Sequence, residues 1–248
     1  MQVLKIGGNE LDDPDFVKGL VGAVRSLAQA PVLVHGGGKE IQQLQQRLGL
    51  EPQYIEGLRV TDQESLGLVT MVLTGRVNKR LVAAFLAGGV DAFGMSGIDR
   101  ASIEAVKLRH PRGDLGQVGR VVAVRSEVFL RLLDDGVMPV VSPLCYGPDG
   151  SIFNVNADHV ALALARELGA EALAFVSNVP GVLDADGRLL DRLTPADVET
   201  LIAGGTISRG MIPKTRAALE AIEGGVAAVR ITDLAGLKDG AGTTIEFD

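Results

Sequence analysis

The chain has 248 residues, of which 46% are hydrophobic and 22% charged, and its formal net charge at neutral pH is −7. This length allows a substantial buried core, as one large α/β domain or as two fused lobes. The acidic balance argues against a surface for nucleic acid or for an anionic membrane, so an anionic substrate would need a few placed cations. The single cysteine, Cys145, excludes an internal disulfide and a zinc site built from several thiolates.

Nothing in the sequence is typical of a targeting segment. The first residues, MQVLKIGGNELDD, become glycine-rich and acidic, unlike a secretory signal peptide. No apolar run reaches the ~18 residues of a membrane helix, because Arg25 and Arg166 interrupt the longest candidates. We therefore expect a cytoplasmic protein that binds neither nucleic acid nor membrane.

Short apolar runs alternate with amphipathic stretches along the chain. The runs that predict strands are 3–6, 31–35, 90–96, 138–142, 172–177 and 226–232. They are apolar on both faces, as a parallel sheet covered by helices requires. The alternation of strands and helices predicts a doubly wound α/β sandwich.

Cap signals mark several helix starts, and two regions break the alternation. Thr61–Glu64 fits a capping box, Thr194 precedes a first-turn proline, and Asn156 precedes an apolar helical stripe. Residues 103–125 predict one β-hairpin, and the turn at 146–150 predicts a second.

Glycine-rich turns follow two of the predicted strands. The segment VHGGGKE (34–40) departs from the P-loop pattern at Leu33 and from the dinucleotide pattern at Ile41. Its consecutive N–H groups at a helix start can still bind an anion; the alternative is a tight turn packed on the sheet. The second turn, Gly7–Gly8, follows Lys5. Because ligands of open α/β sheets lie beyond the carboxyl ends of the strands, the two turns would form one anion site if their strands are neighbours.

Polar residues in two further segments are candidates for a binding site. Arg59 lies in a loop where its guanidinium could bind a carboxylate, although an ordinary surface arginine is the alternative. In NVNAD (154–158), helix capping accounts for Asn156 and Asp158. Capping does not account for Asn154, which shares a strand face with Asn156.

The C-terminal third adds a lysine and a turn. Lys214 opens a helix predicted over 214–223, where a cation opposes the helix dipole and so indicates a role other than helix stability. The turn at 177–181 could hold part of a nucleotide, or it could be turn chemistry alone.

Five motifs occur in a fixed order: KIGG (5–8), VHGGG (34–38), GLRVT (57–61), NVNAD (154–158) and GMIPK (210–214). Each is weak alone, but together they resemble the amino acid kinase family, and within it the members that phosphorylate N-acetyl-L-glutamate. The resemblance covers nearly the whole chain. It implies an αβα sandwich around a mainly parallel open sheet, in one continuous domain. Residues 1–170 would form an acceptor-binding and dimerisation lobe, and residues 171–248 an ATP-binding lobe.

The same resemblance implies a reaction and a role for each matched residue. ATP would give its γ-phosphoryl group to the side-chain carboxylate of N-acetyl-L-glutamate, a step of arginine biosynthesis. Asp158 would orient two lysines. The catalytic residues would be Lys5, Gly8, Gly37, Asp158 and Lys214. The acceptor would be bound by Gly36, Gly37, Arg59, Asn154 and Asn156. The nucleotide would be bound by Lys5, Gly7, Ser177, Asn178, Val179, Gly181, Val182, Leu183, Ile207, Ser208 and Lys214.

The implied chemistry depends on positioning and electrostatics, because a migrating phosphoryl group spreads negative charge over its oxygens. The acceptor carboxylate is ionised at neutral pH, so no general base is needed. We therefore expect His35 to belong to the turn, His110 to a hairpin tip and His159 to a helix. The expected cofactor is magnesium, held mainly by ATP and not by protein ligands.

Two other functions are weighed against this one. Asn178 stands where many family members that phosphorylate N-acetyl-L-glutamate carry aspartate. Asparagine at this position also resembles the pattern of a sister enzyme that phosphorylates carrier-protein-linked aminoadipate in lysine biosynthesis. GLRVT, NVNAD and GGG favour acetylglutamate. A non-catalytic nucleotide-binding regulator is disfavoured, because both lysines and the aspartate are present.

Because Lys5 lies so near the N-terminus, we expect this chain to lack the extra N-terminal helix of hexameric, arginine-inhibited members. The resemblance then implies a homodimer that is insensitive to arginine. We expect its subunits to be joined through helices within residues 62–88.

Overall fold

A mainly parallel sheet of eight strands forms the centre of the computed structural model, which describes residues 1–8, 10–208 and 210–247. The strand order is β12–β14–β13–β11–β1–β2–β8–β5, and only β13 and β14 pair antiparallel. The strands are β1 (Gln2–Ile6), β2 (Val32–His35), β5 (Ala92–Ser96), β8 (Met138–Ser142), β11 (Ala172–Val176), β12 (Arg192–Leu193), β13 (Val229–Thr232) and β14 (Thr243–Ile245). All six predicted strands are confirmed, whereas β12 and β14 were not predicted.

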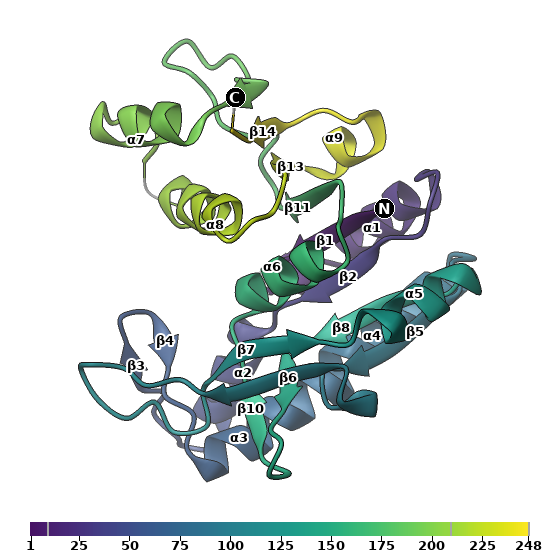
Figure 1. The fold of residues 1–248 in the computed structure, drawn as a ribbon, viewed down its shortest axis with the longest axis vertical. Helices are drawn as coiled ribbons and strands as arrows, with labels where there is room; N and C mark the ends of the chain where they lie inside the picture. The colour runs from purple at the N-terminus through teal and green to yellow at the C-terminus, as the bar shows by residue number, and fades with distance from the viewer. Residues whose placement is uncertain (9, 209, 248) are drawn as a thin grey trace.

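Helices cover both faces of this sheet (Figure 1). Side chains alternate along each strand: Val3 enters one core, and Leu4 and Ile6 enter the other. The core of Val3 is closed by α5 (Ser126–Asp134), α6 (Ala157–Glu167), α7 (Pro195–Ala203) and α8 (Met211–Glu223). The core of Leu4 is closed by α1 (Pro14–Arg25), α2 (Gly38–Arg47), α3 (Gln63–Thr70), the π-helix η2 (Met71–Val77), α4 (Asn78–Ala87) and α9 (Leu234–Asp239). The αβα sandwich is confirmed.

Short elements complete the fold. Both predicted hairpins are confirmed, and they join in a second sheet of four strands, β10 (Ile152–Asn154), β9 (Leu144–Tyr146), β6 (Ile103–Lys107) and β7 (Gly119–Val124). A two-stranded hairpin of β3 (Tyr54–Ile55) and β4 (Leu58–Arg59) was not predicted. Two 3₁₀ turns are η1 (Glu10–Asp12) and η3 (Asp99–Ala101).

Two predicted helix starts are confirmed and two are wrong. Asn156 caps α6, and Thr194 caps α7 in a capping box with Asp197. For α3, however, the cap is Asp62 and not Thr61, because the Asp62 carboxylate accepts the Ser65 N–H. The helix predicted over 214–223 is α8, which begins at Met211, three residues before the predicted start.

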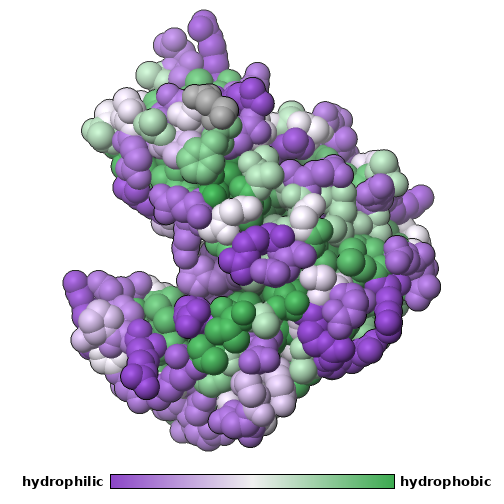
Figure 2. Space-filling view, in the orientation of Figure 1, coloured by the Kyte–Doolittle hydropathy of each residue, from purple (hydrophilic) through white to green (hydrophobic). Residues whose placement is uncertain are grey.

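The elements lie in two groups around β1 (Figure 1). The C-terminal strands, together with α7, α8 and α9, lie on one side, and the small second sheet and the β3–β4 hairpin lie on the other. The sheet is continuous between the groups, because β1 pairs with both β11 and β2. The surface in Figure 2 has a deep hollow between the two groups. Among the helices of the described residues, none is both long and apolar enough to cross a membrane.

Candidate functional site

The two glycine turns touch at the carboxyl ends of β1 and β2. These strands are parallel neighbours, and the Gly36 N–H donates to the Ile6 carbonyl at 3.0 Å. A Cβ atom on Gly8 would lie only 2.7 Å from the nitrogen of Gly37 and 2.8 Å from its Cα, so a side chain at Gly8 would displace the second turn. The predicted adjacency of the turns is confirmed.

The second turn presents unpaired backbone donors. Gly37 precedes the first residue of α2, where the first N–H groups of a helix have no partner within the helix. Within the described part of the chain, no backbone or side-chain oxygen accepts from the Gly37 N–H. Donors of this kind, with the positive end of the helix dipole behind them, favour a bound anion.

A lysine and an aspartate meet beside these turns. The Lys5 ammonium lies 2.8 Å from Oδ1 of Asp158, in the first turn of α6. The side chains are 18% and 27% exposed, so the pair is largely shielded from water. Asn156 caps the same helix by accepting the Asp158 N–H at 2.9 Å. The Lys5 ammonium is thereby fixed at the end of β1.

The second lysine approaches from α8. The Lys214 ammonium donates to the hydroxyl of Ser177, at the end of β11, at 3.1 Å. Burial lowers the pKa of Lys214 below its ordinary value; the charge of Lys5 lowers it further, and the charge of Glu10 opposes both. Among the described residues, the ion pair of Asp158 is with Lys5, and Lys214 is held by Ser177 instead. That Asp158 orients both lysines therefore stays a prediction.

The two lysines face a common cavity of about 200 Å³, the lysine cavity. Its lining includes Lys5, Gly7, Glu10, Asp158, Ser177 and Lys214. Sequence reasoning missed Glu10, a carboxylate three residues after the first glycine of the KIGG turn. The group brings together residues from β1, η1, α6, β11 and α8, which are far apart in the sequence.

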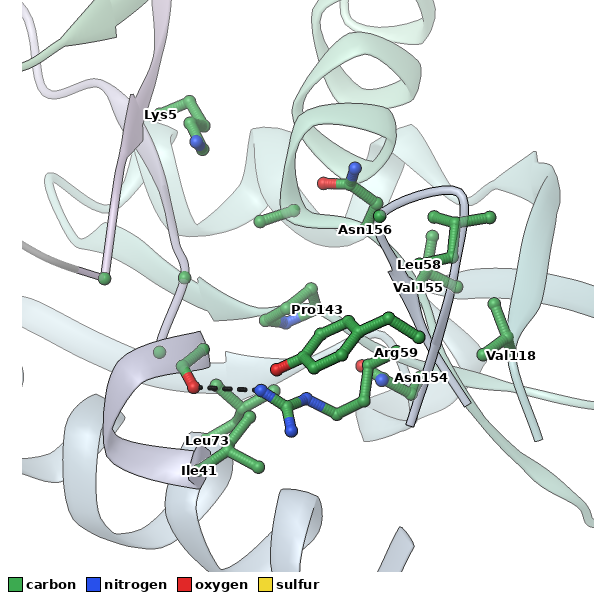
Figure 3. A pocket seen from close by; sticks show the side chains of 17 residues that line it. Lys5, Ile41, Leu58, Arg59, Leu73, Val118, Pro143, Asn154, Val155 and Asn156 are labelled. Carbon is green, nitrogen blue, oxygen red and sulfur yellow. Dashed lines mark hydrogen bonds between the residues drawn. The ribbon is translucent and has the colours of Figure 1, made fainter. Parts of the chain in front are cut away.

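A second cavity of about 280 Å³, the arginine cavity, also has Lys5 in its lining (Figure 3). Its lining includes Lys5, Gly8, Gly36, Gly37, Arg59, Asn154 and Asn156. Five of these residues were predicted to contact the acceptor, and the other two, Lys5 and Gly8, were predicted to be catalytic. The structure brings all seven together around one cavity. Tyr54 and Leu73 also line it, and nothing in their sequence context marked them.

The guanidinium of Arg59 is held at one end of the arginine cavity. It donates to the Gln45 side chain and to the Gly38 carbonyl, the latter at 3.1 Å (Figure 3), and it stacks 4.9 Å from the centre of the Tyr54 ring. Burial lowers the pKa of Arg59, but a guanidinium remains charged at neutral pH. An arginine opposite lysine and glycine N–H groups suits a small molecule with two anionic ends.

Asn154 is oriented toward the same cavity by a buried threonine. Its amide donates to the Thr61 hydroxyl at 3.1 Å, and this hydroxyl in turn donates to the Arg59 carbonyl at 3.1 Å. Thr61 is fully buried. This chain of contacts links the second sheet to the segment that carries Arg59.

Several predicted nucleotide residues line neither cavity: Asn178, Val179, Gly181, Val182, Leu183, Ile207 and Ser208. Residues 178–183 form the loop after β11, beyond Ser177, and the Val182 N–H donates to Thr243 at 2.7 Å. The side chains of Val182 and Ile207 are buried in the core, so contact with a nucleotide would have to come through their backbone. Their roles stay predictions.

Two histidines and the cysteine fit structural roles. His110 pairs with Glu56 at 2.9 Å near the tip of the β6–β7 hairpin, and His159 on α6 pairs with Glu220 at 3.0 Å. Burial raises the pKa of Cys145, which favours an inert thiol. In the described residues, no group of three or more histidine, cysteine, aspartate or glutamate side chains could hold a metal ion.

Comparisons with known proteins agree with this geometry. A model of the amino acid kinase family matches residues 1–233. A protein named acetylglutamate kinase from Roseiflexus sp. (strain RS-1) is 55% identical over 243 residues, which cover 98% of this chain and 92% of that protein.

Solved structures are similar as well. The crystal structure of smu.665 from Streptococcus mutans UA159 matches with a TM-score of 0.81 and 31% identity, covering 100% of this chain and 98% of that one. The structure of N-acetylglutamate synthase from Neisseria gonorrhoeae with coenzyme A and N-acetyl-glutamate matches with a TM-score of 0.83 and 26% identity. All of this chain is covered, but only 59% of the synthase chain.

Proposed function

Because the chain belongs to the amino acid kinase family, we propose that it transfers the γ-phosphoryl group of ATP to the side-chain carboxylate of N-acetyl-L-glutamate. The observation that carries this proposal is the position of Lys5, which lines both the lysine cavity and the arginine cavity. One cation therefore faces both a place for a phosphate chain and a place for a carboxylic acid. The relative at 55% identity that is named acetylglutamate kinase supports the choice of acceptor.

The reaction needs no proton transfer from the protein. A carboxylate oxygen of the acceptor forms a bond to the γ-phosphorus, while the bond from that phosphorus to the bridging oxygen breaks and ADP leaves with the electron pair. The products are the acyl phosphate N-acetyl-L-glutamyl 5-phosphate and ADP. Both reactants are anionic, so the protein must offset their repulsion.

Each group of residues has a part in that task. Lys5 and Lys214 offset the charge of the phosphoryl oxygens, and Asp158 holds Lys5 in place. The N–H groups of Gly8 and Gly37 donate to the transferring group. Arg59 binds the α-carboxylate of the acceptor, and Asn154 and Asn156 bind its amide end.

Magnesium would arrive with ATP. This ion prefers oxygen ligands and is commonly held by substrate phosphates with one or two carboxylates. The lysine cavity fits that pattern, since it offers Glu10 and Asp158, of which Asp158 is already paired with Lys5. When bound, the ion would offset charge on the phosphate oxygens.

The two cavities support the proposed division into lobes. Every residue that lines the arginine cavity lies between Lys5 and Ala157, within the proposed acceptor lobe 1–170. The lysine cavity adds residues from 175 to 217, within the proposed ATP lobe 171–248. We place the reaction in the cytoplasm and in arginine biosynthesis.

We further propose a homodimer joined through helices within 62–88 and the adjacent edge strand. Three large apolar side chains support it: Met71 is 59% exposed, Leu86 52% and Phe93, on the edge strand β5, 51%. Exposed apolar groups of this size on neighbouring elements favour contact with another chain. Sedimentation of the wild type and of a Phe93→Asp variant tests it, and a wild type that sediments as a monomer would refute it.

An acceptor panel tests the proposed function. ADP formation is measured with ATP and magnesium for N-acetyl-L-glutamate, free glutamate, N-acetylaspartate and an aminoadipate derivative. We expect the kcat/KM for N-acetyl-L-glutamate to exceed the others by at least about tenfold. A higher kcat/KM for the aminoadipate derivative would move the assignment to lysine biosynthesis, and no turnover with any acceptor would overturn the assignment as a kinase.

A further inference from the structure

His35, the last residue of β2, is completely buried on the face of the sheet opposite Lys5. Its ring contacts two polar groups. Nδ1 lies 2.9 Å from the carbonyl oxygen of Gly36, and Nε2 lies 3.1 Å from the side-chain nitrogen of Asn78, the first residue of α4. The reaction proposed above uses neither His35 nor Asn78.

These contacts define the tautomer of the ring. The Gly36 carbonyl can only accept, so Nδ1 must carry the proton and donate it. The same side-chain nitrogen of Asn78 also donates to the Val140 carbonyl at 2.8 Å, and only the NH₂ group of an amide can donate. The atom of Asn78 that faces the ring is therefore this NH₂ group, and Nε2 accepts from it. Both ring nitrogens are thus satisfied in the neutral form. Burial lowers the pKa of His35 to about 4, in agreement with a ring that stays neutral at physiological pH.

The carbonyl that His35 holds belongs to the peptide bond between Gly36 and Gly37. In a planar trans peptide the C=O and the N–H point in opposite directions. Fixing the Gly36 oxygen on the histidine side therefore turns the Gly37 N–H away from the ring. A run of glycines restrains its backbone weakly, so a rotation of this peptide would otherwise cost little.

We propose that His35 is a positioning residue, which aims the Gly37 N–H at the transferring phosphoryl group by holding the Gly36 carbonyl with its Nδ1 proton. Asn78 supports it by holding the ring in this tautomer and anchoring it to β8 through Val140. The inference rests on the proposed function, because it assigns a purpose to the Gly37 donor. The histidine itself touches no substrate.

Two matched variants test the proposal. In His35→Asn the amide nitrogen replaces Nδ1 and can still donate to the Gly36 carbonyl, but the bond to Asn78 is lost. In His35→Gln the amide replaces Nε2, so the bond to Asn78 can persist while the bond to Gly36 is lost. Each variant removes the ring and one hydrogen bond, which makes their packing losses comparable.

We expect kcat for the Gln variant to fall about tenfold or more, as for a misplaced transition-state donor, with the KM for ATP within about twofold of wild type. The Asn variant should retain kcat within about threefold of wild type. A purely structural role would instead lower the melting temperature of both variants and leave the kcat of the folded fraction equal. Equal kcat values, or a lower kcat for Asn than for Gln, would overturn the proposal.

Crystal structures of the two variants give a readout that does not depend on turnover. We expect the Gly36–Gly37 peptide to keep its orientation with Asn and to rotate with Gln. An unchanged peptide in the Gln variant would overturn the inference even if the enzyme is an acetylglutamate kinase. A wild type that is inactive with every acceptor, with the peptide rotated only in the Gln variant, would overturn the proposed function and leave the positioning of the peptide established.

Discussion

Lys5 and Asp158 form an ion pair of 2.8 Å that joins the end of the central strand β1 to the first turn of α6. The carboxylate is stabilised there by the positive end of the α6 dipole, and the ammonium also lies 5.9 Å from the centre of the Phe175 ring. A flexible lysine is thereby held in one place between the two cavities. That constraint gives the proposed reaction a fixed cation at the point where acceptor and phosphate would meet.

The two lysines of the lysine cavity should be needed for turnover. We expect Lys214→Ala and Lys5→Ala each to lower kcat by about a hundredfold or more, because each removes a cation that offsets phosphoryl charge. Lys18→Ala, at an exposed position of α1, is the matched control and should keep the wild-type kcat. Steady-state ADP formation on folded protein, verified by circular dichroism, measures this. Near-wild-type turnover of Lys214→Ala would remove that residue from the mechanism.

Arg59 should act on the acceptor and not on the nucleotide. Its guanidinium lies in the arginine cavity, and it is absent from the lining of the lysine cavity. We expect Arg59→Ala to raise the KM for N-acetyl-L-glutamate at least about tenfold, since a charge-assisted hydrogen bond contributes roughly 1.5–3 kcal/mol. The KM for ATP should stay within about twofold. A change confined to ATP would show that the two lobes have been assigned the wrong way round.

A methyl group added at Gly8 should disturb the contact between the two glycine turns and lower activity. We expect Gly8→Ala to lower kcat about tenfold or more, because its Cβ would push the backbone of Gly37 away. Gly22→Ala is the matched control: Gly22 is exposed on α1 and nothing lies within 4 Å of its added Cβ. It should leave kcat unchanged and stabilise the helix by roughly 0.5–1 kcal/mol. Equal activity of the two variants would contradict a close approach at Gly8.

Burial of neutral His35 should make stability depend on pH. Its pKa falls from 6.5 to about 4 on folding, so between these values the unfolded chain binds a proton that the folded chain does not. The free energy of unfolding should therefore decrease as pH falls through this window, by about 3 kcal/mol in total from this group. Urea titrations of wild type and His35→Asn between pH 7 and 4 measure the difference in slope. An equal pH dependence in the two proteins would mean that folding does not lower the pKa of His35.

The central strands could be predicted from the sequence, and the short ones could not. Strands such as β8 and β11 are buried throughout, so their apolar runs are unmistakable. The strands β12 and β14 have two and three residues and include Arg192, Thr243 and Thr244. β12 is the edge strand, and β14 lies between it and β13, so both depend on pairing with neighbours that are distant in the sequence, which is a tertiary effect.

The two wrong helix starts have different causes. Thr61 is a residue type that often caps helices, but its backbone is hydrogen-bonded to Leu115 and Gln117 and its hydroxyl donates to the Arg59 carbonyl. Asp62 therefore caps α3 instead. The helix α8 begins before Pro213, which fits in a first turn because it lacks only an N–H that has no partner there.

Most of the site could be predicted because motif residues follow strand ends, which parallel pairing brings together. Lys5, Gly8 and Gly37 meet for that reason. The partner of each lysine could not be predicted, since side-chain pairing across α6, α8 and β11 depends on packing. Leu73 reaches the arginine cavity from a π-helix, whose wider turn no 3.6-residue periodicity reveals.

The most direct test is a crystal structure with magnesium, a non-hydrolysable ATP analogue and N-acetyl-L-glutamate bound together. We predict that the ammonium groups of Lys5 and Lys214 both lie within roughly 3 Å of oxygens of the terminal phosphate. The acceptor carboxylate should lie in line with the terminal phosphorus, about 3–3.5 Å from it. A closed complex in which either ammonium stays beyond hydrogen-bonding distance of that phosphate, or in which the acceptor lies outside the arginine cavity, would contradict the account.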